Sequence, residues 1–280
     1  MKTILAVVGD GAAEAVLEAA VLAARRFDSK ITGLNALASE YAVVFGGEMG
    51  FSISSEVDRT LEREGAERRE QARNLFNSVM RRRGIALGAG AGGGVSAEWR
   101  EEAGRQNAIV GTLGRVYDLI VVEQPNKAAS FAEATLEDAL FESGRPVLMA
   151  PKAVPAALGE RILVAWNGST ETARTVAFAM PFLKRAVRVE VVSVEGAFVP
   201  GPAADELVRN LKAHGIESAA RHIAVGNKPP GEIFLDEARA MQADLLVKGA
   251  YTQSRLRQMI FGGATRHVIL NAGIPVLLAH

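Results

Sequence analysis

A glycine-containing loop near the carboxyl end of the chain holds the residues best placed to bind an anion. The short apolar run 245–247 predicts a buried strand that ends at Gly249, and a helical pattern begins at Ala264. Gly262 and Gly263 stand directly before that helix. Because a helix N-terminus carries unpaired amide donors and the positive end of the helix dipole, glycines at this place leave room for a phosphate group. The sequence therefore predicts an anion-binding loop between this strand and this helix.

The sequence shows none of the common motifs of metal, nucleophilic or P-loop catalytic sites. The four histidines, His214, His222, His267 and His280, do not show the spacing of a metal site, and there is no cysteine to complete one. Neither a nucleophile elbow nor a P-loop occurs. The string Gly88 to Gly93 reads G-x-G-x-x-G, but it follows a helix and precedes a strand, so we interpret 87–94 as a flexible connector. We therefore predict that the protein is not an enzyme, and that any turnover is slow and incidental.

The stretch 243–279 resembles the C-terminal signature of the universal stress protein family. Nucleotide-binding members of that family carry G-x2-G-x9-G-[S/T] between their fourth strand and fourth helix. Gly249 and Gly262 occupy the first and third positions, Thr252 replaces the second glycine, and Gly263 replaces the Ser/Thr. The flanking sequences, Asp244-Leu-Leu-Val before the loop and Pro275-Val-Leu-Leu after it, match the family frame.

The resemblance implies that the second half of the chain binds ATP or AMP, with Mg²⁺. The implied nucleotide-binding residues are Ala165, Asn167, Gly249, Thr252, Gly262, Gly263, Ala264 and Thr265. Asn167 stands where the family has an acidic residue, and it keeps hydrogen-bonding capacity without the charge. Lys248 and Arg255 are cations able to neutralise a phosphate.

Three landmarks recur in the same order in the two halves of the chain. An apolar run stops at Gly9-Asp10-Gly11 in the first half and at Asn167-Gly168 in the second; Asp118-Leu-Ile-Val-Val corresponds to Asp244-Leu-Leu-Val-Lys, and Pro146-Val-Leu-Met to Pro275-Val-Leu-Leu. This repetition predicts an internal duplication. We expect two domains, residues 1–151 and 159–280, with the seam near 151–158.

Strands that alternate with helices, and that are almost continuously apolar, predict an α/β fold with a parallel sheet covered on both faces. Each half shows five such strands, near 3–8, 30–36, 95–100, 118–122 and 146–150, and near 161–166, 188–194, 217–224, 244–248 and 275–279. The fold class predicted is therefore two doubly wound, Rossmann-like domains in tandem, similar to the adenine nucleotide alpha hydrolases. The family resemblance implies strand order 3-2-1-4-5, which brings Asn167 and Gly168 opposite the Gly249 loop.

The first half differs at the corresponding loop. Glu123 stands in the place of Gly249, and no later glycine follows it before the next strand. A carboxylate at this point repels phosphate and removes the conformational freedom of glycine. The acidic residue of the first strand is also displaced, because Gly9 occupies its place and Asp10 comes one position later. We predict that the first half does not bind nucleotide in the manner of the family.

The first half is also longer, because a loop over 38–54 and a charged helical stretch over 57–83 separate its second and third strands. The apolar positions of that stretch are Val57, Leu61, Ala72, Leu75, Phe76 and Val79, with Glu and Arg between them at helical spacing. Two interpretations stay open. The helix either binds a partner or simply lays one apolar stripe on the sheet and leaves the other face in water.

Composition bounds the remaining classes. Lys and Arg together number 32, as do Asp and Glu, so the net charge gives no case for binding nucleic acid or an anionic membrane. No apolar stretch approaches the ~20 residues needed to span a bilayer, and the N-terminal apolar run is too short for a signal peptide. We therefore expect a cytoplasmic protein, and the absence of cysteine fits a reducing compartment.

The predicted function, implied by the resemblance, is stress-response regulation through a bound adenine nucleotide. Family dimers form through the last strand, so 147–149 and 276–278 are expected to pair within this chain as a pseudo-dimer, and a homodimer stays open. The alternative is a nucleotide-free interaction protein in which both sites have decayed and helix 57–83 meets a partner.

Overall fold

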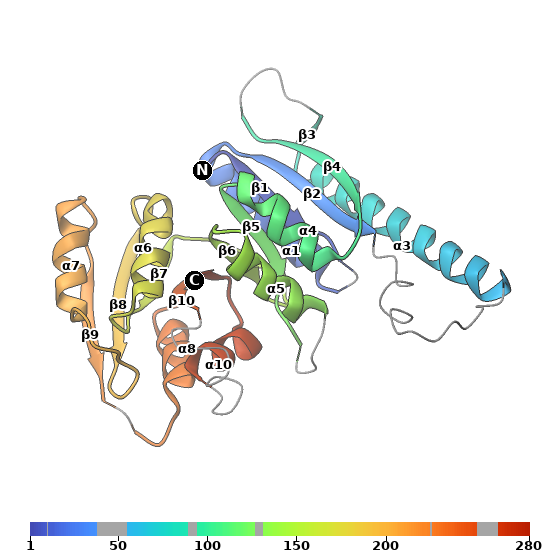
Figure 1. The fold of residues 1–280 in the computed structure, drawn as a ribbon. Helices are drawn as coiled ribbons and strands as arrows, with labels where there is room; N and C mark the ends of the chain where they lie inside the picture. The colour runs from blue at the N-terminus through green and yellow to red at the C-terminus, as the bar shows by residue number, and fades with distance from the viewer. Residues whose placement is uncertain (10, 38–54, 89–93, 127–130, 225, 251–262) are drawn as a thin grey trace.

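The computed structural model describes residues 1–9, 11–37, 55–88, 94–126, 131–224, 226–250 and 263–280, with the backbone alone for 55–62. Within these residues, eleven strands form one sheet in the order β3-β4-β2-β1-β5-β6-β11-β10-β7-β8-β9 (Figure 1). Each half of the chain supplies one half of this sheet. The sheet is parallel except at its centre, where the two halves join.

The first half confirms the predicted strand order. Its strands are β1 (Thr3–Val7), β2 (Lys30–Leu37), β3 (Ala86–Leu87), β4 (Ser96–Ala103), β5 (Leu119–Glu123) and β6 (Val147–Ala150). Without β3, they lie in the order 3-2-1-4-5. The short strand β3 corrects our interpretation of 87–94 as a connector throughout, because Leu87 pairs in parallel with Ala97 on β4. Of the G-x-G-x-x-G string itself, only Gly88 is described, and 89–93 lie outside the described residues.

The second half repeats this order on the other side of the joint. Its strands are β7 (Arg161–Ala165), β8 (Arg188–Val194), β9 (Ala219–Ile223), β10 (Leu245–Gly249) and β11 (Val276–Ala279). These bounds differ by at most two residues from those that the apolar runs predict. The predicted and observed strand ends agree because a turn-forming residue, Gly, Pro, Asn or Asp, stands close to most of them.

Helices cover both faces of the sheet, as its nearly continuous apolar strands require. One face carries α1 (Ala13–Phe27), α3 (Ser55–Arg82), α6 (Thr170–Leu183) and α7 (Ala204–Ala213). The other carries α4 (Gln106–Leu113), the 3-10 turn η1 (Gly114–Val116), α5 (Phe131–Glu142), α8 (Pro230–Ala240) and α10 (Ala264–Asn271). The core is therefore split by the sheet into two apolar layers, each of which runs through both halves of the chain.

The two halves meet edge to edge through their last strands. β6 and β11 pair antiparallel, with Val276 opposite Met149 and Leu278 opposite Val147. This is the pairing of 147–149 with 276–278 that the family resemblance implies. It covers two strand edges that would otherwise present unpaired backbone groups to another chain. Phe27 of α1 adds a second contact between the halves, because its ring meets Phe182 of α6 edge-on at 4.8 Å between centroids.

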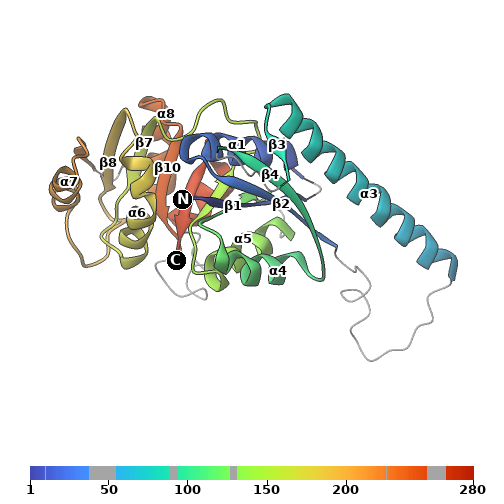
Figure 2. The same ribbon diagram turned by 90° about the horizontal axis from the view of Figure 1, so that it is seen from above.

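The long helix α3 packs on the sheet by its C-terminal part alone. Ala72, Phe76 and Val79 are buried there, as the predicted apolar stripe requires, while most side chains over 63–71 are exposed. Phe76 lies so close to β2 that a Cβ on Gly33 would fall 2.6 Å from its ring. The other end of α3 projects past the sheet (Figure 2). The predicted stripe positions 57 and 61 lie among the residues whose side chains are not described.

No helix in the described part of the chain is both long enough and apolar enough to cross a membrane.

Candidate functional site

The predicted site residues gather at the carboxyl ends of two neighbouring strands. Lys248 of β10 pairs with Ala165 of β7, so the residues that follow both strands emerge at the same edge of the sheet. Asn167 and Gly168 follow β7, and Gly249 ends β10. The structure therefore brings together Ala165, Asn167 and Gly249, as the strand order predicts. In doubly wound sheets this edge is where ligands bind.

Asn167 shapes the turn that leads into α6. Its Oδ1 accepts a hydrogen bond of 2.6 Å from the hydroxyl of Thr172 and one of 3.2 Å from the backbone N–H of Ser169. Ser169 is the N-cap of α6, and its hydroxyl accepts from the N–H of Thr172 at 3.1 Å. The N-terminus of α6 is thus capped by protein side chains. The side-chain oxygen of Asn167 works in that turn, a role that the sequence did not reveal.

Gly249 is required by a close approach of β10 to α6. A Cβ at this position would lie 2.5 Å from both the backbone nitrogen and the hydroxyl oxygen of Thr172. No L-amino acid with a side chain fits there without movement of the helix. Packing against α6 is therefore enough to explain why residue 249 is glycine, whether or not a ligand binds at the sheet edge.

Among the described residues, no side chain caps the N-terminus of α10, whereas Ser169 caps that of α6. The N-cap of α10 is Gly263. Among the described residues, nothing lies within 4 Å of a Cβ built on Gly263. Ala264 and Thr265 form the first turn, so amide donors at this end lack a side-chain cap. The predicted residues Thr252 and Gly262 lie outside the described residues.

Lys248 is a buried cation at the same edge of the sheet. It is 4% exposed, and its Nζ donates a 3.2 Å hydrogen bond to the carbonyl of Gly249. Removal from water lowers the pKa of this amine to about 8. Sequence inspection identified Lys248 as a nearby cation but not as a buried one. Alternation along β10 carries the missing signal, since Leu246 and Ala250, on the same side, both lie in the apolar layer beneath α8 and α10.

In the first half, Glu123 fills the corresponding place with a carboxylate. Its Oε2 accepts a hydrogen bond of 2.7 Å from the backbone N–H of Ala12, directly before α1. A Cβ at Gly11 would overlap this carboxylate, so the turn before the helix closes tightly on Glu123. The protein thus supplies its own anion to this helix N-terminus.

A hydrogen-bonded chain of Ser193, His222 and Asp205 was missed at the sequence level. The Ser193 hydroxyl lies 2.8 Å from His222 Nδ1, and His222 Nε2 lies 2.7 Å from Asp205 Oδ2. These are the residue types of a hydrolase triad, but Ser193 is 0% exposed, and a nucleophile must reach its substrate. The chain instead fastens α7 to β8 and β9. No sequence motif marks it, because the three residues come from three separate elements.

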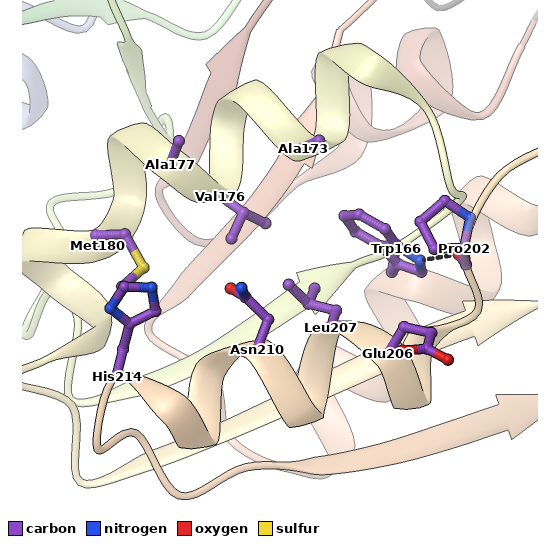
Figure 3. Close-up of a pocket in the computed structure, with 10 residues that line it drawn as sticks. All are labelled: Trp166, Ala173, Val176, Ala177, Met180, Pro202, Glu206, Leu207, Asn210 and His214. Carbon is purple, nitrogen blue, oxygen red and sulfur yellow. Dashed lines mark hydrogen bonds between the residues drawn. The ribbon is translucent and has the colours of Figure 1, made fainter.

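A pocket of about 340 Å³ lies between α6 and α7, on the face where Trp166 projects (Figure 3). Its lining is mostly apolar, with Trp166 fixed at one end by a 2.8 Å hydrogen bond from Nε1 to the Pro202 carbonyl. None of the predicted nucleotide-binding residues lines it. Within the described residues, no group of three or more His, Asp or Glu side chains is arranged to hold a metal ion.

These features define a class, the Rossmann-like α/β proteins whose ligand edge lies at the carboxyl ends of a doubly wound parallel sheet. Comparison with known proteins identifies a family within this class. The model of the universal stress protein family matches residues 159–280. The second half of this chain is therefore a universal stress protein domain. A search of curated proteins found no match.

Solved structures extend the likeness in fold to the first half. A universal stress protein from Archaeoglobus fulgidus superimposes with a TM-score of 0.70 at 18% identity, covering 99% of this chain and 95% of its own. A putative universal stress protein from Pseudomonas aeruginosa gives a TM-score of 0.55 at 17% identity, covering 100% and 93%. Both comparisons span the two halves, so the whole chain shares this architecture with single chains of that kind.

Proposed function

We propose that the second domain binds an adenine nucleotide, ATP or AMP with Mg²⁺, and that the protein acts in stress-response regulation by binding rather than by catalysis. The phosphates would lie on the first turn of α10, at Gly263, Ala264 and Thr265, and the base and ribose toward the end of β7. The family match supports the class of ligand. The proposal is carried by the uncapped N-terminus of α10 at the ligand edge, where amide donors and the helix dipole favour an anion.

The contrast among three helix N-termini supports placing the phosphates at α10. Glu123 already accepts from the N–H of Ala12 before α1, and Ser169 caps α6. Among these three, α10 alone starts at a glycine, and no described residue lies within 4 Å of a Cβ built on it. The first half is therefore proposed to be a structural partner domain without a nucleotide of its own.

A thermal-shift titration with ATP or AMP in the presence of Mg²⁺ tests the proposal. Ligand at 100 times its dissociation constant should stabilise the protein by ~2.7 kcal/mol. The variant Gly263→Asp places a carboxylate at the N-cap, where it competes with phosphate but itself caps the helix well. We expect it to abolish the nucleotide-dependent shift without loss of stability in the absence of nucleotide.

The matched control is Gly65→Asp, on the exposed part of α3, where nothing lies within 4 Å of a built Cβ. It introduces the same charge far from α10 and should leave the nucleotide-dependent shift unchanged. Absence of a shift at millimolar ATP and AMP, or an equal shift in Gly263→Asp, would overturn the proposal. Phosphate release in excess of the protein concentration would show turnover and contradict the non-catalytic part.

The projecting part of α3 favours a second candidate function, binding of a protein partner. Residues 63–71 are mostly exposed, and the helix extends beyond the sheet without a neighbour among the described elements (Figure 2). This is the nucleotide-free alternative. The titration separates the two functions, because partner binding through α3 requires no nucleotide-dependent stabilisation.

A further inference from the structure

Lys248 is a basic residue buried in the apolar core of the second domain. It is 4% exposed, and within the described residues no carboxylate lies within ion-pairing distance of its amine. Its one hydrogen bond, to the Gly249 carbonyl, leaves two of its three N–H donors without a partner there. Burying an ammonium group without a counter-charge is costly, and such groups concentrate at functional sites.

The hydrogen bond fixes where the amine lies along the strand. Gly249 is the last residue of β10, so its carbonyl holds the amine at the carboxyl edge of the sheet. The side chain lies on the side of α8 and α10, because Leu246 and Ala250, two residues away in each direction, belong to that apolar layer. Lys248 therefore presents its charge at the ligand edge and not on the opposite face, beneath α6.

A second buried polar group lies on the same side, in the first turn of α10. Thr265 is 5% exposed. The first turn of α8 encloses this corner, since a Cβ on Gly231 would lie 2.7 Å from the carbonyl oxygen of Ala264. A buried cation, a hydroxyl and an uncapped helix N-terminus thus share one edge and one face of the sheet. All three favour an anion.

We propose that Lys248 binds a phosphate group seated on the first turn of α10, with the Thr265 hydroxyl as a further donor. The inference rests on the proposed nucleotide site and names the side chain that holds its phosphate. The phosphate comes from a nucleotide or from free inorganic phosphate. Burial lowers the pKa of Lys248 to about 8, so the amine is still largely protonated at neutral pH and able to form the ion pair.

This role has a signature that a structural role lacks. Lys248→Met removes the charge and keeps an unbranched side chain of similar length in an apolar setting. If the lysine serves a ligand, the variant should be more stable than the wild type and bind more weakly. A lysine kept for the fold would give the opposite result, a less stable protein with unchanged binding.

Isothermal titration calorimetry at pH 7 tests the inference with three probes: ATP with Mg²⁺, inorganic phosphate and adenosine. In Lys248→Met we expect binding of ATP and of phosphate to weaken by about tenfold or more, as for loss of a charged hydrogen bond, with adenosine unaffected. The control Lys212→Met removes an exposed lysine from α7 and should match the wild type. In the unmutated protein, the ¹³Cε shift of Lys248 should titrate at higher pH once phosphate is added.

The other outcomes distinguish the role of Lys248 in phosphate binding from nucleotide binding by the second domain. ATP binding that is equal in wild type and Lys248→Met overturns the role of Lys248 and leaves nucleotide binding intact. Phosphate binding that depends on Lys248, without any binding of ATP or adenosine, supports the phosphate site and overturns the nucleotide proposal. If the wild type binds none of the three probes, both proposals fail.

Discussion

Replacing Lys248 with methionine should stabilise the protein in the absence of ligand. Desolvation lowers the pKa of this amine from 10.5 to about 8. Because a difference of one pH unit is worth about 1.4 kcal/mol, the buried charge costs the folded state about 3 kcal/mol. Methionine carries no charge and packs well in irregular apolar space, so the variant escapes this cost. For a chain of 280 residues the gain corresponds to a rise in Tm of about 5 °C.

The pH dependence follows from the same shift. The folded protein releases the Lys248 proton near pH 8, whereas the unfolded chain releases it near pH 10.5. Between these values the unfolded state binds more protons, so raising the pH favours the folded state. The penalty is therefore fully present below pH 8 and disappears as the pH rises through 10.5. Wild type and variant should differ most at neutral pH and converge at alkaline pH.

Urea denaturation of wild type and Lys248→Met, repeated between pH 7 and pH 10.5, measures this difference directly. Other titrating groups are common to the two proteins and cancel. Lys212→Met, at an exposed position on α7, should change the free energy of unfolding by less than about 0.5 kcal/mol at every pH. A destabilised Lys248→Met, or a difference that does not vary with pH, would refute the claim that Lys248 is a charge buried without compensation.

Two further predictions concern the turns and glycines, and equilibrium urea denaturation measures both. Glu123→Ala removes the acceptor for the Ala12 N–H and should lower the free energy of unfolding by about 1 kcal/mol; an unchanged midpoint would show that the carboxylate does not cap α1. Gly249→Ala places a Cβ 2.5 Å from the Thr172 nitrogen and should cost about 1–3 kcal/mol, whereas Gly65→Ala, in an exposed helix with open space, should gain about 0.5–1 kcal/mol. Equal effects of the two alanines would contradict the close approach of β10 to α6.

The regular elements were predictable from the sequence because their signals are local. The helix expected to begin at Ala264 is α10, and the strand expected over 161–166 is β7, because in both places an apolar pattern stands next to glycine or asparagine. Strand order followed from the family resemblance, not from the residues. The two-residue strand β3 was missed because Ala86 and Leu87 are exposed and too few to show a pattern.

The side-chain arrangement at the site was less predictable, because it depends on contacts between distant elements. Gly249 was interpreted as a ligand residue, yet its Cα lies against Thr172, which comes 77 positions earlier in the chain. The contacts of Ser193 with His222 likewise cross two strands. Composition and periodicity report which side of an element is apolar, but not which two atoms meet across an interface. The burial of Lys248 was predictable in part. Alternation along β10 indicates on which face of the sheet its side chain lies, but not that the side chain has no acidic partner among the described residues.

The two halves differ in how they supply hydrogen-bond acceptors to the helix that follows their first strand. In each half, the helix after the first strand begins beside the end of the fourth strand, and its first amides need acceptors. The first half takes the acceptor from the fourth strand, as the carboxylate of Glu123. The second half takes it from the turn itself, as Ser169 and Asn167, so that Gly249 contributes no side chain. Local capping thus leaves the end of β10 without a side chain on the α6 face, whereas the corresponding end of β5 carries the Glu123 carboxylate against the start of α1.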